Sequence, residues 1–96
     1  MAEQFNPNEA SSPVSVTTGA TALLVANGNR TLLSLKAAAA NTAVIYVTLD
    51  GTTPTAGNHH IELSPKEGVV YDSPAPGGAI LALAASGTQS LCVVEA

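Results

Sequence analysis

The chain has 96 residues, of which 46% are hydrophobic, 10% charged and 3% aromatic, with a formal net charge of -4. This length supports one domain with one small core, and a single cysteine excludes an internal disulfide. Arg30, Lys36 and Lys66 are too scattered to neutralise a run of phosphates, and no run of about 18 apolar residues occurs, so we expect neither direct nucleic-acid binding nor a membrane segment.

Residues 1–13, MAEQFNPNEASSP, are mostly polar, contain two prolines and follow neither the helical nor the strand period. They also lack the basic and apolar regions of a secretion signal, so we expect folding in the cytoplasm, where Cys92 stays reduced. The sequence thus predicts an extended, flexible N-terminal arm over residues 1–13 and one domain over residues 14–96.

The first strand signal lies just after this arm. Val14 and Val16 alternate with Ser15 and Thr17, which is the two-residue period of a strand with one buried face. The next segment, TALLVANGNR, is an apolar run that ends in Asn-Gly-Asn, and these residues tolerate tight turns. We expect a second strand here that closes in a hairpin or a corner.

The stretch LLSLKAAAANTAVIYV, residues 32–47, fits two structures. A helix would gain from the alanines, but it would have no acidic first turn and no terminal glycine. Two strands fit better, because both halves alternate. We expect two strands joined by an alanine-rich corner, with room for a short helical turn at residues 37–40. Leu33, Leu35 and Ala37 would share one face of the first strand, and Ala43, Ile45, Val47 and Leu49 would share one face of the second.

Short strands and turns fill the second half of the chain. Asp50-Gly51 ends a strand, TTPTAGNHH is a loop, and strands are expected over residues 61–63 and 69–71. The segment SPAPGG suits neither helix nor ladder. GAILALAASG and TQSLCVVEA are expected to form a closing hairpin around Ser86-Gly87, with two apolar faces. The whole pattern predicts an all-β fold, namely a single small antiparallel β-sandwich of seven or eight short strands, immunoglobulin-like or jelly-roll-like.

The adjacent histidines His59 and His60 are the only imidazole pair. On a strand they would point to opposite faces; in a loop they could share a metal ion only with a third ligand such as Glu62. Asp50 with its threonine neighbours is a weak calcium set and is explained by a turn. We therefore expect a solvated loop and no metal site or other cofactor.

No pattern in the chain indicates catalysis. Cys92 lies in the apolar segment LCVV, without a base or a positive neighbour in the local sequence, and GTTPTAG lacks the lysine of a phosphate-binding loop. We expect the protein not to be an enzyme. The low charge indicates instead that partners cover much of the exterior, although a small sandwich solvated by Thr, Ser and Asn would also explain it.

Four stretches carry a resemblance to a known group: NRTLLSLKA, AVIYVTLDG, IELSPKEGVVYDS and GGAILALAASGTQSLCVVEA. An arginine before a strand, a Tyr-Val strand and a Leu-x-Pro turn are among the recurring features. The chain resembles the small β-sandwich virion proteins of tailed bacteriophages, in particular capsid decoration (cement) proteins. It departs from them at Ala37, where that group often has asparagine.

The resemblance implies a structural protein without catalysis that binds the exterior of the assembled virion head, commonly as a homotrimer, and bridges capsomers of the major capsid protein. Phe5 is the only phenylalanine, and in the polar arm it is either a lone apolar residue or an anchor on a neighbouring subunit. We expect the capsid-contact arm to comprise Phe5, Asn6, Pro7, Asn8 and Glu9. We expect self-association through Leu81, Leu83 and Val94.

Two other functions stay open at this point. The chain could be a different virion component, such as a fibre base or a tail protein. It could also be a host-adhesion or ligand-binding module, with a pocket or a metal near His59, His60 and the TTPTAGN loop.

Overall fold

A computed structural model describes residues 13–72 and 74–96, and within them the fold is all-β. Eight strands form two four-stranded antiparallel sheets, which confirms the predicted sandwich. The arm predicted over residues 1–13 lies outside the described residues except for Pro13, which begins the first strand. The strands are β1 (Pro13–Val16), β2 (Thr21–Leu24), β3 (Leu32–Ala37), β4 (Ile45–Thr48), β5 (Ile61–Leu63), β6 (Gly68–Asp72), β7 (Ile80–Ala84) and β8 (Gln89–Glu95).

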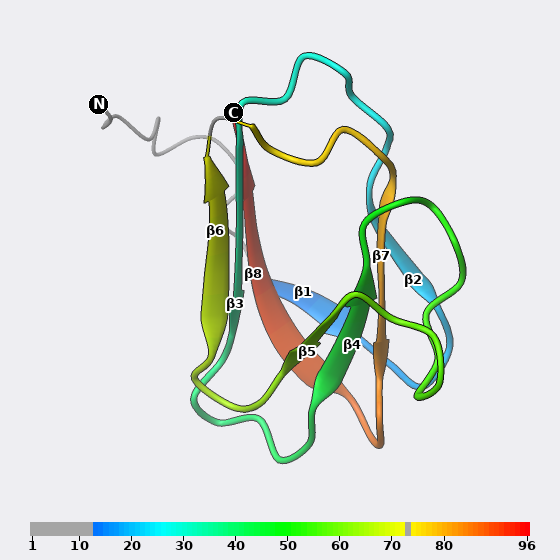
Figure 1. Ribbon diagram of the computed structural model, residues 1–96. Helices are drawn as coiled ribbons and strands as arrows, with labels where there is room; N and C mark the ends of the chain where they lie inside the picture. The colour runs from blue at the N-terminus through cyan, green and yellow to red at the C-terminus, as the bar shows by residue number, and fades with distance from the viewer. Residues whose placement is uncertain (1–12, 73) are drawn as a thin grey trace.

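The two sheets face each other across one core (Figure 1). The first sheet has the strand order β1-β8-β3-β6, and the second has the order β2-β7-β4-β5. Of strands that follow each other in the chain, only β4 and β5 pair in a ladder within the described part. Nearly every connection therefore crosses from one sheet to the other, so the two sheets are linked covalently at both ends of the sandwich.

The core consists of alternate residues from both sheets, as a two-residue period requires. In β3 and β8 the odd-numbered residues point inward, and in β7 the even-numbered ones do. The buried apolar set is Val16, Leu33, Leu35, Ala37, Ile45, Val47, Leu63, Ile80, Ala82, Ala84, Leu91 and Val93.

The alanine-rich stretch forms two strands, as predicted. β3 and β4 belong to different sheets, and residues 38–44 form the corner between them. A hydrogen bond of 3.1 Å from the Asn41 N–H to the Ala38 carbonyl closes a turn there. The side chain of Asn41 also bonds the backbone of Ser90 as donor and acceptor, both at 2.8 Å, so that it extends the ladder on β8 where β3 has ended.

The expected closing hairpin is wrong, because β7 and β8 lie in different sheets. Each is a central strand flanked on both sides, β7 by β2 and β4, and β8 by β1 and β3. Residues 85–88 carry the chain across the sandwich, with Gly87 at a φ of 61°. The apolar character of both strands reflects this central position and not pairing with each other.

Three loops and the C-terminus lie toward one end of the sandwich: residues 25–31, residues 74–79 and the C-terminus are at the top of Figure 1, and the β4–β5 loop starts beside residues 78–79 and extends below them on the right. We call this the upper loop end; it comprises residues 25–31, the β4–β5 loop at 49–60, and the β6–β7 loop within 74–79. The opposite lower end carries the short connections at 17–20, 38–44, 64–67 and 85–88.

Candidate interaction surfaces

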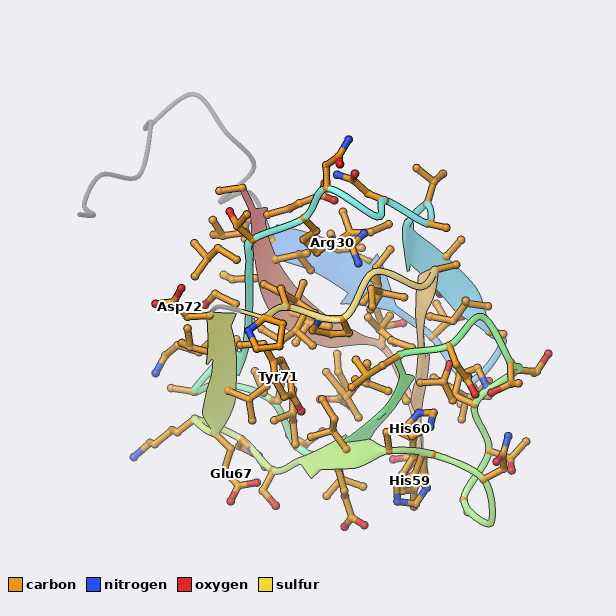
Figure 2. The ribbon with its side chains drawn as sticks, turned by 45° about the horizontal axis from the view of Figure 1, so that its top comes forward. Arg30, His59, His60, Glu67, Tyr71 and Asp72 are labelled. Atoms are coloured by element: carbon orange, nitrogen blue, oxygen red, sulfur yellow. The ribbon has the colours of Figure 1, made fainter. Side chains whose placement is uncertain are left out.

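Arg30 holds the upper loop end together from within. Its side chain is fully buried, and Figure 2 places it beneath the loop that carries it. Its Nε donates to Glu95 Oε2 at 2.8 Å, and Nη1 donates to the carbonyls of Pro76 at 2.6 Å and Gly78 at 3.0 Å. Nη2 donates to the Val25 carbonyl at 2.8 Å. One guanidinium thus joins both flanking loops to the end of β8.

This arrangement supports the fold and offers no free group for chemistry. Each guanidinium nitrogen is used by an acceptor of the protein itself, and the planar fork satisfies several carbonyls that loops otherwise leave unpaired. Asn27 reinforces the contact, because its Nδ2 donates to Glu95 Oε2 at 3.3 Å and its N–H donates to the Gly77 carbonyl at 2.8 Å. Sequence reasoning noted the charge of Arg30 but not this role.

The β4–β5 loop is built mainly from its own hydrogen bonds. The Asp50 carboxylate accepts the Thr52 hydroxyl at 2.6 Å and the Thr52 N–H at 3.1 Å. Asn58 Nδ2 donates to the Thr53 carbonyl at 3.1 Å. Gly78 packs against the start of the loop so closely that a Cβ there would lie 2.5 Å from the Leu49 carbonyl oxygen. These contacts define the conformation of the loop.

The Thr52 hydroxyl donates to the Asp50 carboxylate and thereby lowers the pKa of Asp50 below its ordinary value of 3.8. The Thr52 N–H adds to this effect. Because the folded-state pKa is depressed, the interaction stabilises the fold above the unfolded-state pKa and is lost as the pH falls through the folded-state value.

We expect Thr52→Val to raise the pKa of Asp50 toward 3.8, since it removes the hydroxyl donor and keeps the shape. An NMR titration of the Asp50 carboxyl carbon measures this directly. Thr53→Val, the same change one residue further on, is the control and should leave the pKa of Asp50 unchanged. An unchanged Asp50 titration in Thr52→Val would contradict the assignment.

The two histidines bind different partners. His59 Nδ1 lies 3.0 Å from the Thr55 carbonyl, its Nε2 lies 3.6 Å from Glu62 Oε1, and its ring centroid is 4.7 Å from that of Tyr46. His60 Nδ1 instead accepts the Leu49 N–H at 3.0 Å. Both lie where β5 begins (Figure 2). Within residues 13–72 and 74–96, no three His, Cys, Asp or Glu side chains form a group that could hold a metal ion.

The three residues predicted for self-association do not share a surface. Leu81 and Leu83 point outward from β7, whereas Val94 points outward from β8 in the other sheet. All three are half-buried in the isolated chain. The capsid-contact residues Phe5, Asn6, Pro7, Asn8 and Glu9 lie outside the described residues.

The outer face of the first sheet presents mostly uncharged side chains. One row across the strands consists of Val70, Ser34 and Val94, and the next consists of Gly68, Lys36, Cys92 and Pro13. Val70 is 64% exposed and, with Val25 at 81%, is one of two large hydrophobic side chains that stand clear of the described surface. Sequence reasoning missed both, because an isolated valine in a strand or loop carries no signal of its own.

Cys92 lies on this same face and is half-buried. The sheet places Lys36 directly opposite it, a positive neighbour that the local sequence did not indicate. The Lys36 ammonium, however, donates to the Lys66 carbonyl at 3.3 Å, on the side away from the cysteine.

No family model, curated protein or solved structure matches the chain in the comparisons with known proteins. Among the described residues no helix is long and apolar enough to cross a membrane.

Proposed function

We propose that this protein is a phage capsid decoration, or cement, protein that binds the exterior of the assembled head and stabilises it by bridging capsomers. Its partner is the major capsid protein, and it acts as a homo-oligomer, with the trimer as the form that the resemblance implies. It is not an enzyme. Its place is the outside of the virion, after a passage through the host cytoplasm during assembly.

The observation that carries this proposal is the outer surface of the sandwich. Both sheets turn half-exposed apolar side chains outward, Leu81 and Leu83 on one and Val94 on the other, with Val70 at the edge. With 10% charged residues in the chain, little charge separates these patches. Such a surface suits a protein whose working state is covered by partners. The four stretches of the resemblance fall on β3, β4, β5–β6 and β7–β8, which makes up most of the sandwich.

Stabilisation of a shell by such a protein follows from mass action. A subunit that binds assembled capsomers but not free coat protein lowers the free energy of the closed shell. Because many copies bind one particle, a modest energy per contact adds up, and an oligomer that bridges several capsomers gains further from its high effective concentration. The arm around Phe5 would add contacts beyond the rigid sandwich.

The arm is tested by binding to preformed empty shells of the major coat protein encoded in the same genome. We expect deletion of residues 1–12, and Phe5→Ala alone, to reduce shell binding at least tenfold in co-sedimentation, because the anchor is lost while the sandwich stays folded. Gln4→Ala, a polar change beside Phe5, is the matched control and should bind as the unchanged chain does. Full affinity of the truncated protein would show that the arm mechanism is wrong.

A second function, a ligand-binding module, is favoured by one observation. Three loops meet at the upper loop end, the arrangement through which many sandwiches present binding residues on a rigid frame. Saturable binding to a glycan, abolished by changes at Val25 and in the β4–β5 loop, together with no binding to shells, would support it. Binding to a portal, tail or fibre in place of the shell would indicate a different virion role.

A further inference from the structure

The four edge strands of the two sheets differ in how well they are protected. β1 begins with Pro13. The residue that follows the strand, Thr17, accepts the Ala84 N–H of the other sheet through its carbonyl at 2.8 Å, so the chain leaves this edge toward that sheet. β2 is interrupted by a bulge between Ala22 and Leu24, and β5 has three residues with a charged Glu62 at its centre. Bulges, prolines, charges and shortness are the features that keep sheet edges from pairing.

β6 has neither a bulge nor a proline, and its one charged residue, Asp72, lies at its end and not at its centre. It has five residues, more than the other edge strands, and it pairs with β3 in regular register from Leu32 to Lys36. Its central side chain, Val70, is apolar and 64% exposed. A regular edge strand with an exposed hydrophobic centre is a template for strand addition.

The ladder also fixes which backbone groups of β6 face outward. The Ala37 N–H donates to the Glu67 carbonyl at 2.8 Å, which sets the hydrogen-bonded positions of this antiparallel pair. Val69 and Tyr71 therefore bond to β3, and the backbone groups of Gly68 and Val70 point away from the sheet. Val70 lies at the centre of this outward-facing set.

We propose that β6 pairs with β6 of a second copy of this chain, antiparallel and about a two-fold axis at Val70. This register places Val70 opposite Val70 of the second copy, and Gly68 opposite Asp72 of the second copy. The two four-stranded sheets then join into one continuous sheet. Such an interface is isologous, since each copy contributes the same strand and each contact occurs twice.

The charges of the outer face complement each other in this register. Lys36 is the neighbour of Gly68 in the sheet, and a Cβ at residue 68 would lie 3.3 Å from Lys36 Cβ and 3.4 Å from its Cγ. The lysine stem therefore runs over the bare glycine toward the free edge. Across that edge, in the same row, stands Asp72 of the second copy, which is exposed and carries the opposite charge. Two such ion pairs flank the central valines.

The inner face is complementary as well. Tyr71 and Asp72 leave opposite faces of β6 (Figure 2), and Val69 shares the inner side with Tyr71; both are half-buried and pack against the core. Two-fold pairing places Val69 opposite Tyr71 of the second copy at a non-hydrogen-bonded position, where side chains approach most closely. Aromatic and β-branched residues form favourable cross-strand pairs. Both faces of β6 therefore fit a copy of themselves.

This inference concerns the protein alone and does not depend on the proposed function, because it is tested without any particle. It makes Val70 the centre of self-association in place of Leu81, Leu83 and Val94, and it predicts a two-fold dimer in place of the trimer that the resemblance implies.

The test is the mass in solution by sedimentation equilibrium. We expect Val70→Pro to halve the mass, because proline removes the outward N–H and adds a ring at the axis while the bonds to β3 remain. Ser15→Pro is the matched control. The Ser15 N–H also points away from the same sheet, at its opposite edge β1, and the mass of this variant should equal that of the unchanged chain. An unchanged mass in Val70→Pro, or an unchanged chain that is monomeric at every concentration, would overturn the proposal.

A charge exchange gives a second readout that does not depend on proline. Lys36→Glu and Asp72→Lys are each expected to weaken the dimer several-fold, since each leaves two pairs of like charges across the edge, and the double variant should restore the affinity of the unchanged chain. Independent effects of the two substitutions, without restoration, would contradict the register. In a Cys92→Ala background, Val70→Cys should form an intermolecular disulfide, and Val25→Cys should not.

Discussion

Arg30→Met is expected to lower the free energy of unfolding by about 3–5 kcal/mol, because it removes the buried partner of a part-buried ion pair together with the donors to three carbonyls. The variant leaves Glu95 without its strongest partner and the carbonyls of Val25, Pro76 and Gly78 without donors. For a domain of this size the melting temperature should fall by about 4–8 °C per kcal/mol. Urea unfolding followed by circular dichroism, at fixed protein concentration, measures the change.

Arg30→Lys separates charge from geometry. A lysine keeps the positive charge, but its single ammonium cannot reach acceptors from both loops and β8 at once. We expect most of the loss seen with methionine to persist. Lys66→Met removes an exposed charge and should change stability by less than about 0.5 kcal/mol. If Arg30→Lys were as stable as the unchanged chain, the guanidinium network would not be what secures the upper loop end.

Gln89→Leu is expected to cost about 2–4 kcal/mol, because it leaves no polar partner for two part-buried backbone N–H groups and one carbonyl at the lower end of the sandwich. Gln89 is 3% exposed; its Oε1 accepts the N–H of Thr42 at 2.8 Å and of Ala43 at 3.4 Å, and its Nε2 donates to the Ser86 carbonyl at 2.9 Å. The residue therefore ties the alanine-rich corner to the crossing between β7 and β8. Thermal unfolding monitored by circular dichroism reports the loss.

The matched control for Gln89→Leu is Thr88→Leu, the same introduced side chain at the exposed preceding position. It should leave stability nearly unchanged. Hydrogen exchange adds a local readout, since the amides of Thr42 and Ala43 should lose protection in Gln89→Leu more than those of β3. Equal protection in both variants would contradict the role given to Gln89.

The strand positions could be predicted because their signals are local. From Leu33 onward β3 alternates between inward apolar residues and outward polar ones, and β5 and β6 are followed closely by prolines or turn residues. The alternating pattern on both sides predicted strands despite the helical preference of the alanines at residues 37–40. Their small side chains suit the corner, where the chain passes from one sheet to the other. The choice between a strand and a helix thus rested on period rather than on composition.

Pairing between strands could not be predicted in the same way. The closing hairpin was expected because two apolar strands flank Ser86-Gly87, yet such a turn serves a crossing between sheets equally well. Which strands become neighbours depends on how the inner faces of the whole set fill one core. The exposure of Val70 and the burial of Arg30 follow from that arrangement, so neither could be predicted from its own neighbourhood in the sequence.

The thermal stability of empty shells, with and without the protein, tests most directly whether this chain is a cement protein. The shells are assembled from the major coat protein of the same genome, and their disruption is followed by light scattering and differential scanning calorimetry. Saturating protein should raise the disruption temperature by several degrees and remain with the pelleted shells. Shells that melt at the same temperature while the protein stays in the supernatant would contradict the proposed function.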